Sequence, residues 1–430
     1  MIVSKYGKLF LDYYNQKNNC AITPKEFVTD KLLPFLYNGK RLMFVMNSIF
    51  TNPSNKKYSF DAKLKMFVEG VENGACDASI VIGGFAKGFD ATTSFNVALD
   101  YIPKYNEDDV YLSWIGGALS VSLDTNNIQF LFNSPEILYD IYTGWERLNV
   151  LNNDPIYKDF SENQINTYNG LWLNYLAKKS KRPSTPEFNP YIDSAIKKGD
   201  SSSLINTSWI SLLFNLGNRY NYDMVNAYVF RYVRDNFTYG NVSIYLKKMS
   251  NIIEYFRSNF EGYDYLSTLE NYEKVVGRNS LDAICRYGVI GLIPLKPEIL
   301  RLEEKSYSKD ADKNKCYNNI NAYDQKFINL YIMSKLKFTD DQLDSIVKGL
   351  HTFKDSPSTK SSGTKIIEEL WNAGNNLKVV NVLTKLAEYI DNGIEKETIL
   401  AIEALFKSEK VIDYREIIAV LKYKYIMFNK

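Results

Sequence analysis

The sequence has few of the residues from which most catalytic and metal-binding sites are built. One of its 430 residues is a histidine, His351, and four are cysteines: Cys20, Cys76, Cys285 and Cys316. A single histidine excludes a His-paired zinc site and disfavours Ser–His or Cys–His catalysis. We expect His351 to be a packing residue or a charge near a helix end. No two cysteines have metal-ligand spacing and the four form no dense framework, which predicts reduced thiols and a cytoplasmic protein.

Loops that bind phosphate or calcium are also missing from the sequence. No Gly-x-x-x-x-Gly-Lys-Ser/Thr motif is present, and "GGFAKGF" from Gly83 to Phe89 has the wrong spacing, so it is read as a turn or bulge. The stretch "KDADKNK" from Lys309 lacks the sixth-position glycine and the twelfth-position glutamate of a calcium loop, and a polar loop is expected there. No apolar run of about 18 residues predicts a membrane span.

One group of charged residues loosely resembles a metal-dependent nuclease site. Glu298, Glu303 and Lys305 lie together in "PEILRLEEK". A solvated helix face is the favoured interpretation, and a nuclease is kept as an alternative function. The sequence therefore predicts no catalytic residues, no metal site and no cofactor.

The composition is that of an ordinary globular protein long enough for two domains. Hydrophobic residues make up 45% and charged residues 24%, and the formal net charge is +2. Any basic surface must therefore be local. The 33 tyrosines and 24 phenylalanines are typical of an AT-rich genome, with base-stacking tyrosines as the alternative.

The first part of the chain has the pattern of helices. Residues 6–47 are expected to be mainly helical, and "ITPKEFVTDKL" predicts a capping box in which Thr23 caps a helix and Glu26 closes it. A second helix is predicted over Asp61–Glu69.

Short β-branched and aromatic runs broken by Gly and Asn follow. They predict a small β-rich insert at about 75–133, and the run at 109–124 is read as strand and turn. A helix capped by Ser134 should come next. The Pro-, Ser- and Lys-rich stretch at about 178–203 predicts a basic loop or linker.

From about residue 321 the apolar residues recur every three or four positions, which predicts helices throughout. Short connections favour antiparallel neighbours and hence a C-terminal helical bundle over 321–430. The predicted fold class is α+β: a mixed N-terminal domain over 1–320 with a small β-rich insert, followed by that bundle.

The strongest candidate for a binding surface is "NSIFTNPSNKK". It combines amides, hydroxyls and two lysines around a proline, which are the groups that hold phosphates and base edges. Proline restricts the loop and lowers the cost of ordering it. A plain helix-capping turn is the alternative. The candidate residues are Asn47, Thr51, Asn52, Ser54, Asn55, Lys56 and Lys57.

The order of several stretches resembles the large subunit of the type I-B CRISPR Cascade complex, in its Cst branch. These stretches are "ITPKEFVTDKL", "NSIFTNPSNKK", "IQFLFNSPEILYDIYTGWERL", "WISLLFNLGNRYNYDMVNAYVFRYV", "ENYEKVVGRNSLDAI" and "FINLYIMSKLKFTDDQLDSIVKGLH". They span most of the chain. Many relatives carry paired cysteines in the middle, apparently for zinc, whereas this chain has Cys76 alone there. That departure implies an insert without zinc.

The resemblance implies a non-catalytic subunit that contacts duplex DNA beside the protospacer-adjacent motif and supports R-loop formation. Its implied partners are the crRNA-bound backbone, the small subunits, target double-stranded DNA, and a helicase-nuclease or transposition adaptor. Asn52 and Asn55 would read bases, and Lys56 and Lys57 would contact phosphate. Weaker candidates for the DNA backbone or the displaced strand are Lys178, Lys179, Lys181, Arg182, Arg219, Arg231 and Arg234. A scaffolding subunit without DNA contact, from another defence or phage assembly, is the alternative.

Overall fold

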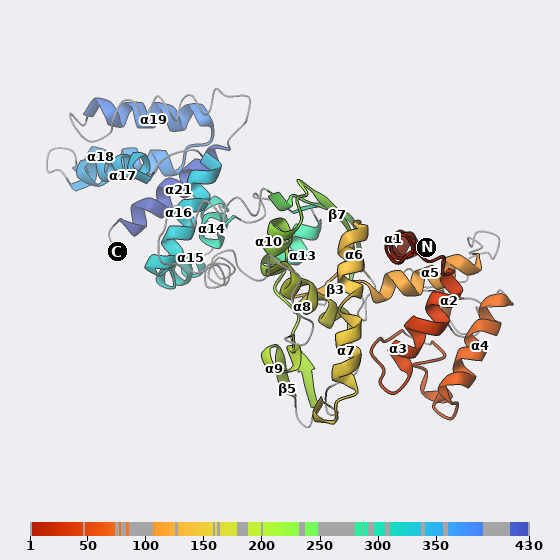
Figure 1. Ribbon diagram of the computed structural model, residues 1–430. Coiled ribbons are helices and arrows are strands. Elements are labelled where there is room, and N and C mark those ends of the chain that lie inside the picture. Colours follow the sequence, from red (N-terminus) through yellow and green to blue (C-terminus); the bar gives the residue numbers. More distant parts are fainter. Residues whose placement is uncertain are drawn as a thin grey trace. The chain divides into compact units, whose positions relative to one another are not determined.

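The chain divides into two compact units (Figure 1). The first unit comprises Met1–Ser250 with Leu281–Gly291, and the second comprises Asn251–Ser280 with Leu292–Lys430. The computed structural model describes residues 2–45, 48–73, 77–78, 83–85, 106–124, 128–157, 160, 164–178, 188–198, 201–231, 237–247, 280–286, 288–290, 296–305, 310–336, 340–355, 360–389 and 413–428.

The first unit begins with four helical segments. They are α1 (Ile2–Asn18), α2 (Pro24–Glu26), the π-helix η1 (Phe27–Leu32) and α3 (Leu33–Tyr37). The predicted capping box is confirmed, because the Glu26 amide donates to Thr23 Oγ1 over 3.2 Å while the Thr23 amide donates to Glu26 Oε2 over 2.8 Å. The segment from Asn38 to Val45 is not helical.

The next helix, α4 (Phe60–Glu72), confirms the helix predicted over Asp61–Glu69, and Ser59 caps it. The short strands β1 (Asp77–Ala78) and β2 (Gly83–Phe85) pair antiparallel. The strands predicted within 86–105 lie outside the described residues.

The strand expected at the start of the 109–124 run is wrong. The residues from Glu107 to Ala118 form the 12-residue helix α5, which Asn106 caps by accepting from the Asp109 amide over 2.7 Å. Three acidic side chains in its first turn stabilise the helix, because they lie at the positive end of the helix dipole. Local charge and capping therefore outweigh the β-type pattern here.

A five-stranded sheet forms the centre of the first unit. Its strands are β3 (Val121–Leu123), β4 (Ile128–Phe132), β7 (Val225–Arg231), β8 (Phe237–Ile244) and β9 (Val289–Ile290). Their order is β3-β4-β7-β8-β9, antiparallel except for the parallel pair β8 and β9. All five residues of β4 are buried. The mixed sheet and the helices confirm an α+β fold.

The first unit contains further helices. They are α6 (Pro135–Tyr142), α7 (Trp145–Asn152), α8 (Ile165–Lys178), α10 (Trp209–Arg219) and α13 (Ser280–Arg286), with a short 3-10 helix η5 (Pro155–Tyr157). Ser134 caps α6, as predicted, by accepting from the Ile137 amide over 3.3 Å. Trp114, Trp172 and Trp209 are fully or almost fully buried and provide much of the core.

The expected basic linker at 178–203 contains regular structure. It holds α9 (Pro190–Asp193) and the strand β5 (Ala195–Lys198), which pairs antiparallel with β6 (Ser201–Leu204). The linker prediction is therefore wrong over 190–198 and 201–203, because this segment forms a short helix and two strands paired in register from Ala195 with Leu204 to Lys198 with Ser201. Residues 179–187 lie outside the described part of the chain.

The described elements of the second unit are all helices. They are α14 (Glu298–Glu304), α15 (Asp310–Asn318), α16 (Ala322–Leu336), α17 (Asp340–Asp355), α18 (Lys360–Trp371), α19 (Asn376–Tyr389) and α21 (Tyr414–Met427). The polar loop expected from Lys309 is wrong, since Asp310–Asn318 is helical. Buried side chains from most of these helices share one core, among them Ile332, Ile346, Leu370, Leu383 and Leu421. The second unit includes α14 and α15, which precede residue 320. The boundary at 320 between a DNA-contacting domain and a C-terminal bundle stays a prediction. Among the described helices, none is both long and apolar enough to cross a bilayer.

Candidate nucleic-acid interface

The predicted loop is a chain of tight turns between α3 and α4. The amides of Thr51 and Asn52 both donate to Ser48 O, over 3.1 and 2.9 Å. The Asn55 amide donates to Asn52 O over 3.0 Å, and the Lys56 amide donates to Pro53 O over 3.2 Å. The backbone of the loop is thus internally hydrogen-bonded. Asn47 lies outside the described residues.

Thr51 holds this loop together from inside. Its side chain is buried, and its Oγ1 lies 2.8 Å from Ser48 Oγ and donates to the Val45 carbonyl. A buried hydroxyl with these partners is not exposed to a ligand. We therefore assign Thr51 to the support of the loop and not to its contact surface.

Phe50 anchors the loop to the core of the first unit. Its ring is buried and stacks on Tyr37 with centroids 4.7 Å apart and an interplanar angle of 9°. Phe67 and Trp114 lie at 5.7 and 6.0 Å from it. Such aromatic packing keeps the loop in one position relative to the helices. Sequence reasoning did not assign this role to Phe50, although an aromatic residue inside a polar loop was the available signal.

Asn52 caps a single turn of 3-10 helix, η2 (Pro53–Asn55). Its Oδ1 accepts from the Ser54 amide over 3.0 Å and from Ser54 Oγ over 2.7 Å. The capping-turn interpretation of this stretch is therefore part of the structure. In the described part of the chain, Asn52 Nδ2 has no hydrogen-bond acceptor, so the residue can cap with its oxygen and donate with its nitrogen.

The outer face of the turn carries the cations. Ser54, Lys56 and Lys57 are exposed and Asn55 is half-buried. Neither lysine has an ion-pair partner among the residues described, and Lys57 Nζ lies 5.1 Å from the centre of the Tyr58 ring. Two ammonium groups beside amide donors on a fixed turn form an arrangement that can bind an anionic oxygen such as a phosphate.

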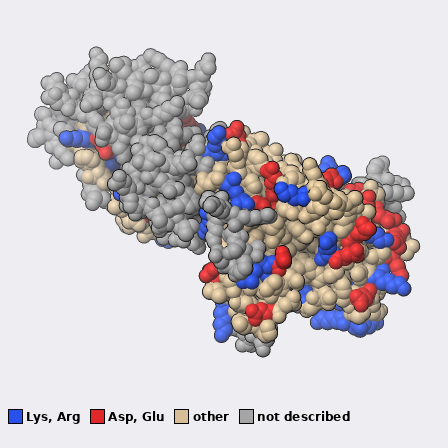
Figure 2. All heavy atoms as spheres, viewed as in Figure 1, with Lys and Arg blue, Asp and Glu red and all other residues tan. Residues whose placement is uncertain are grey.

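The face of the first unit drawn in Figure 2 carries both signs of charge. Figure 2 shows Lys and Arg interspersed with Asp and Glu over the described surface of this face. No broad field of one sign is visible there. A basic contact must therefore be local, as the net charge of +2 predicts.

The weaker basic candidates are not brought together into one described patch. Lys178 is exposed at the end of α8. Arg231 ends β7, and its Nη1 lies 4.0 Å from Asp282 Oδ1. Lys179, Lys181, Arg182 and Arg234 lie outside the described residues.

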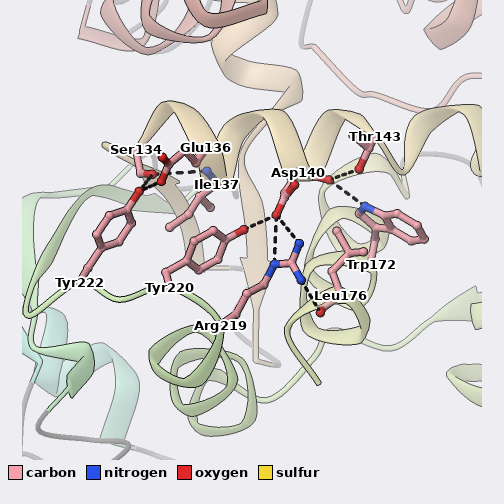
Figure 3. Close-up of polar contacts among 10 residues, drawn as sticks. All are labelled: Ser134, Glu136, Ile137, Asp140, Thr143, Trp172, Leu176, Arg219, Tyr220 and Tyr222. Atoms are coloured by element: carbon pink, nitrogen blue, oxygen red, sulfur yellow. Dashed lines mark hydrogen bonds and ion pairs between the residues drawn. The ribbon is translucent and has the colours of Figure 1, made fainter. Parts of the chain in front are cut away.

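Arg219 is occupied by a contact inside the first unit (Figure 3). Its Nε and Nη2 donate to Asp140 Oδ2 over 3.1 and 2.9 Å, and its Nη1 donates to Leu176 O over 3.1 Å. The Tyr220 hydroxyl donates to the same carboxylate oxygen over 2.6 Å. Burial and the neighbouring Asp140 charge raise the Tyr220 pKa. Arg219 therefore joins α10 to α6 and α8, and we do not keep it among the DNA-contacting residues.

The two ends of α6 are fixed by further contacts in the same region. Tyr222 approaches the N-terminal end of the helix, where its hydroxyl lies 3.2 Å from Ser134 Oγ and donates to Glu136. Trp172 Nε1 donates to the Asp140 carbonyl over 2.8 Å. The side chains of Tyr222 and Trp172 therefore attach α6 to its neighbours within the first unit.

The residues of the nuclease alternative are divided between different roles. Glu303 is 5% exposed in its side chain, lies 3.2 Å from Lys313 Nζ and accepts from the Tyr317 hydroxyl over 3.2 Å. Glu298 is exposed at the start of α14, and Lys305 follows its end. No group of three or more His, Cys, Asp or Glu able to hold a metal occurs within the described ranges.

His351 is a packing residue, which agrees with the sequence-based expectation. Its ring stacks on Tyr425 with centroids 3.9 Å apart and on Phe428 at 5.0 Å. Its Nε2 lies 3.0 Å from the Tyr425 carbonyl oxygen.

In comparisons with known proteins, no family model, curated protein or solved structure matches this chain.

Proposed function

We propose that the chain is a non-catalytic large subunit of an RNA-guided, CRISPR-type surveillance complex that contacts duplex DNA beside the target. The contact surface is the loop face formed by Asn52, Asn55, Lys56 and Lys57. In this assembly the guide RNA supplies sequence recognition, and the protein reads a short duplex motif and the DNA backbone. The proposal also implies a cytoplasmic location, where the target DNA would be.

One observation supports the proposal: the turn presents two lysines that have no carboxylate partner within the part of the chain that the structure describes. A loop already held by Phe50, Thr51 and backbone hydrogen bonds loses little entropy on binding. The two lysines of the turn would lie against phosphates. Asn52 Nδ2 and the side-chain amide of Asn55 would reach acceptors on base edges.

The partner subunits follow from the same proposal. The helices of 321–430 would form an antiparallel bundle that lines the R-loop beside small subunits. Other faces would meet the crRNA-bound backbone and recruit a helicase-nuclease or a transposition adaptor. The resemblance of the stretches quoted above supports this part of the proposal.

The decisive experiment measures DNA binding by the full chain reconstituted with crRNA and the neighbouring subunits. Lys56→Ala/Lys57→Ala should weaken binding and reduce the slope of log K against log salt by roughly 1.8, since each phosphate contact contributes about 0.9. Lys8→Ala/Lys17→Ala removes two exposed lysines from α1 and should leave the slope unchanged.

A second variant separates base reading from loop stability. Asn52→Ser keeps a side chain that can cap η2 and removes the Nδ2 donor. It should reduce discrimination between targets with and without a flanking motif while guide loading survives. Unchanged slope and discrimination in both loop variants would reject the loop as a DNA contact.

A scaffolding subunit without DNA contact is the second candidate, and exposed aliphatic side chains favour it. Ile156 is 77% exposed and Ile192 is 71% exposed. They flank Tyr157 and Tyr191, whose rings stack at 5.1 Å. Exposed apolar groups of this kind occur at protein interfaces. If Ile156→Ser/Ile192→Ser abolishes assembly while the loop variants leave DNA binding intact, scaffolding is the better account.

A further inference from the structure

A hollow of about 720 Å³ lies in the first unit, on the side where α3 and η1 face α6, α7 and α8. Its inner lining consists of the buried side chains of Phe27, Leu32, Trp145 and Trp172. Small-molecule sites are typically hollows of roughly 300–1,000 Å³ lined by such residues. The size and lining are therefore those of a ligand pocket.

The inner tryptophans close the floor of the hollow, because their rings are buried and their N–H groups are already used. The aromatic surface that a ligand can meet comes from the half-buried rings of Phe35, Tyr139 and Tyr142, which also line the hollow. Trp145 Nε1 already donates to Asn169 Oδ1 over 2.9 Å, and Trp172 Nε1 donates to the Asp140 carbonyl over 2.8 Å. Phe35 lies against Trp145 with centroids 5.3 Å apart and an interplanar angle of 17°. The walls are thus suited to a flat ring that stacks.

The mouth of the hollow is polar and carries both charges. Lys31, Glu146, Asn149 and Asn153 line it and are exposed. Across the described ranges, neither Lys31 nor Glu146 forms an ion pair. Asn153 Nδ2 donates to Asn149 Oδ1 over 3.4 Å, so the two side-chain amides lie side by side at the end of α7.

A π-helix contributes one wall. In η1 the Leu33 amide donates to the Val28 carbonyl, five residues back, immediately before Pro34. Proline cannot donate an N–H and would clash with the carbonyl four residues earlier, so the wider turn relieves both problems. The same segment supplies Phe27, Lys31 and Leu32 to the hollow. Single π-type turns are rare and are often found at functional sites.

We propose that this hollow binds an adenine nucleotide with a single phosphate, free or within a single strand. The adenine stacks in the aromatic part, and Asn149 pairs with its edge, since an asparagine amide matches the donor and acceptor of adenine N6 and N7. Lys31 meets the phosphate, and Glu146 accepts from ribose hydroxyls. One lysine, without a glycine-rich phosphate loop in the sequence, suits one phosphate and not a triphosphate. None of the residues of the DNA-contacting loop lines the hollow, so this site is separate from the proposed function.

The test uses the full chain and follows tryptophan fluorescence while AMP is added. AMP should bind and change the emission, because Trp145 and Trp172 line the hollow. Lys31→Gln and Asn149→Ala should each weaken AMP binding about tenfold, the effect of losing one charge-assisted or bidentate contact. Lys17→Gln, an exposed lysine at the end of α1, is the matched control and should bind as the native chain does.

Three competing ligands make the result decisive. CMP should bind at least about tenfold more weakly than AMP because a pyrimidine lacks the adenine edge, and inorganic phosphate should not compete at equal concentration. Binding of an oligo(A) RNA strand, which keeps the 2′-hydroxyl, more tightly than AMP would assign the nucleotide to a strand, and the reverse would assign it to a free nucleotide.

Other outcomes overturn the proposal. They are equal affinity for AMP and CMP, no binding of either AMP or oligo(A), and unchanged AMP affinity in both variants. Both substitutions replace exposed residues, and thermal melts of the variants check that folding is retained.

Discussion

Replacing Asp140 with alanine removes the acceptor on which two segments of the first unit converge. Asp140 Oδ2 accepts from Arg219 Nε, Arg219 Nη2 and the Tyr220 hydroxyl over 3.1, 2.9 and 2.6 Å. The Arg219 side chain is 19% exposed and that of Asp140 is 15% exposed. The variant therefore leaves a guanidinium and a hydroxyl largely buried without their acceptor.

The size of the effect follows from this burial. Breaking a buried ion pair by removing one partner costs about 3–5 kcal/mol. Because some of each side chain stays in contact with water, we expect the lower end, about 3 kcal/mol. At roughly 2–4 °C per kcal/mol for a unit of this size, the unfolding midpoint should fall by about 6–12 °C.

Tryptophan fluorescence can follow the first unit by itself. Of the 5 tryptophans, Trp114, Trp145, Trp172 and Trp209 belong to the first unit and Trp371 to the second. In a Trp371→Phe background, urea unfolding followed by fluorescence thus reports the free energy of unfolding of the first unit.

Two further variants test the reasoning. Asp12→Ala breaks the surface pair with Lys8, whose side chains are 63% and 66% exposed, and should cost less than about 0.5 kcal/mol. Asp140→Leu/Arg219→Met removes both charges and should be more stable than Asp140→Ala alone. If Asp140→Ala costs no more than Asp12→Ala, or if the double variant is the least stable, the buried contact does not stabilise the unit as argued.

Two other predictions concern packing and pH. Gly116→Ala should destabilise the first unit by about 1–3 kcal/mol, because a Cβ at Gly116 would lie 2.3 Å from the Val3 carbonyl oxygen and force α1 and α5 apart. Gly70→Ala in α4 meets nothing within 4 Å and should stabilise by about 0.5–1 kcal/mol, so urea melts showing equal effects of the two would contradict the close helix crossing. Hydrogen bonds from Tyr239 and Arg286 lower the Asp282 pKa below its usual value, so this carboxylate stabilises the fold above the unfolded pKa of about 3.9 and loses that contribution as pH falls through the lower folded pKa. The native chain should therefore lose more stability than Asp282→Asn between about pH 6 and pH 2 in urea melts, and equal losses would show that Asp282 is not the group responsible.

Features encoded within a few residues could be predicted from the sequence. The Thr23 and Ser134 caps are confirmed, because a capping side chain and the amides it accepts from lie within one turn. The stretch 322–336, whose apolar periodicity predicts a helix, is α16. The turn at Asn52 and Pro53 is likewise local.

The tertiary structure decided which polar groups stay accessible. Arginine is a residue type that often contacts DNA, but the fold places Asp140, 79 positions away in the sequence, beside Arg219. Phe50 and Thr51 lie in one short loop with the exposed Lys56, yet both are buried because Tyr37 and Val45 meet them there.

The same division explains α5 and the hollow. An apolar stretch such as 109–118 suits a buried helix or a buried strand, and its capping and packing against α1 selected the helix. The residues around the hollow come from separate helices, so no local pattern marks them. Caps and periodicity act over a few residues and are written in the sequence, whereas burial and ion pairing depend on which distant segments the fold brings into contact.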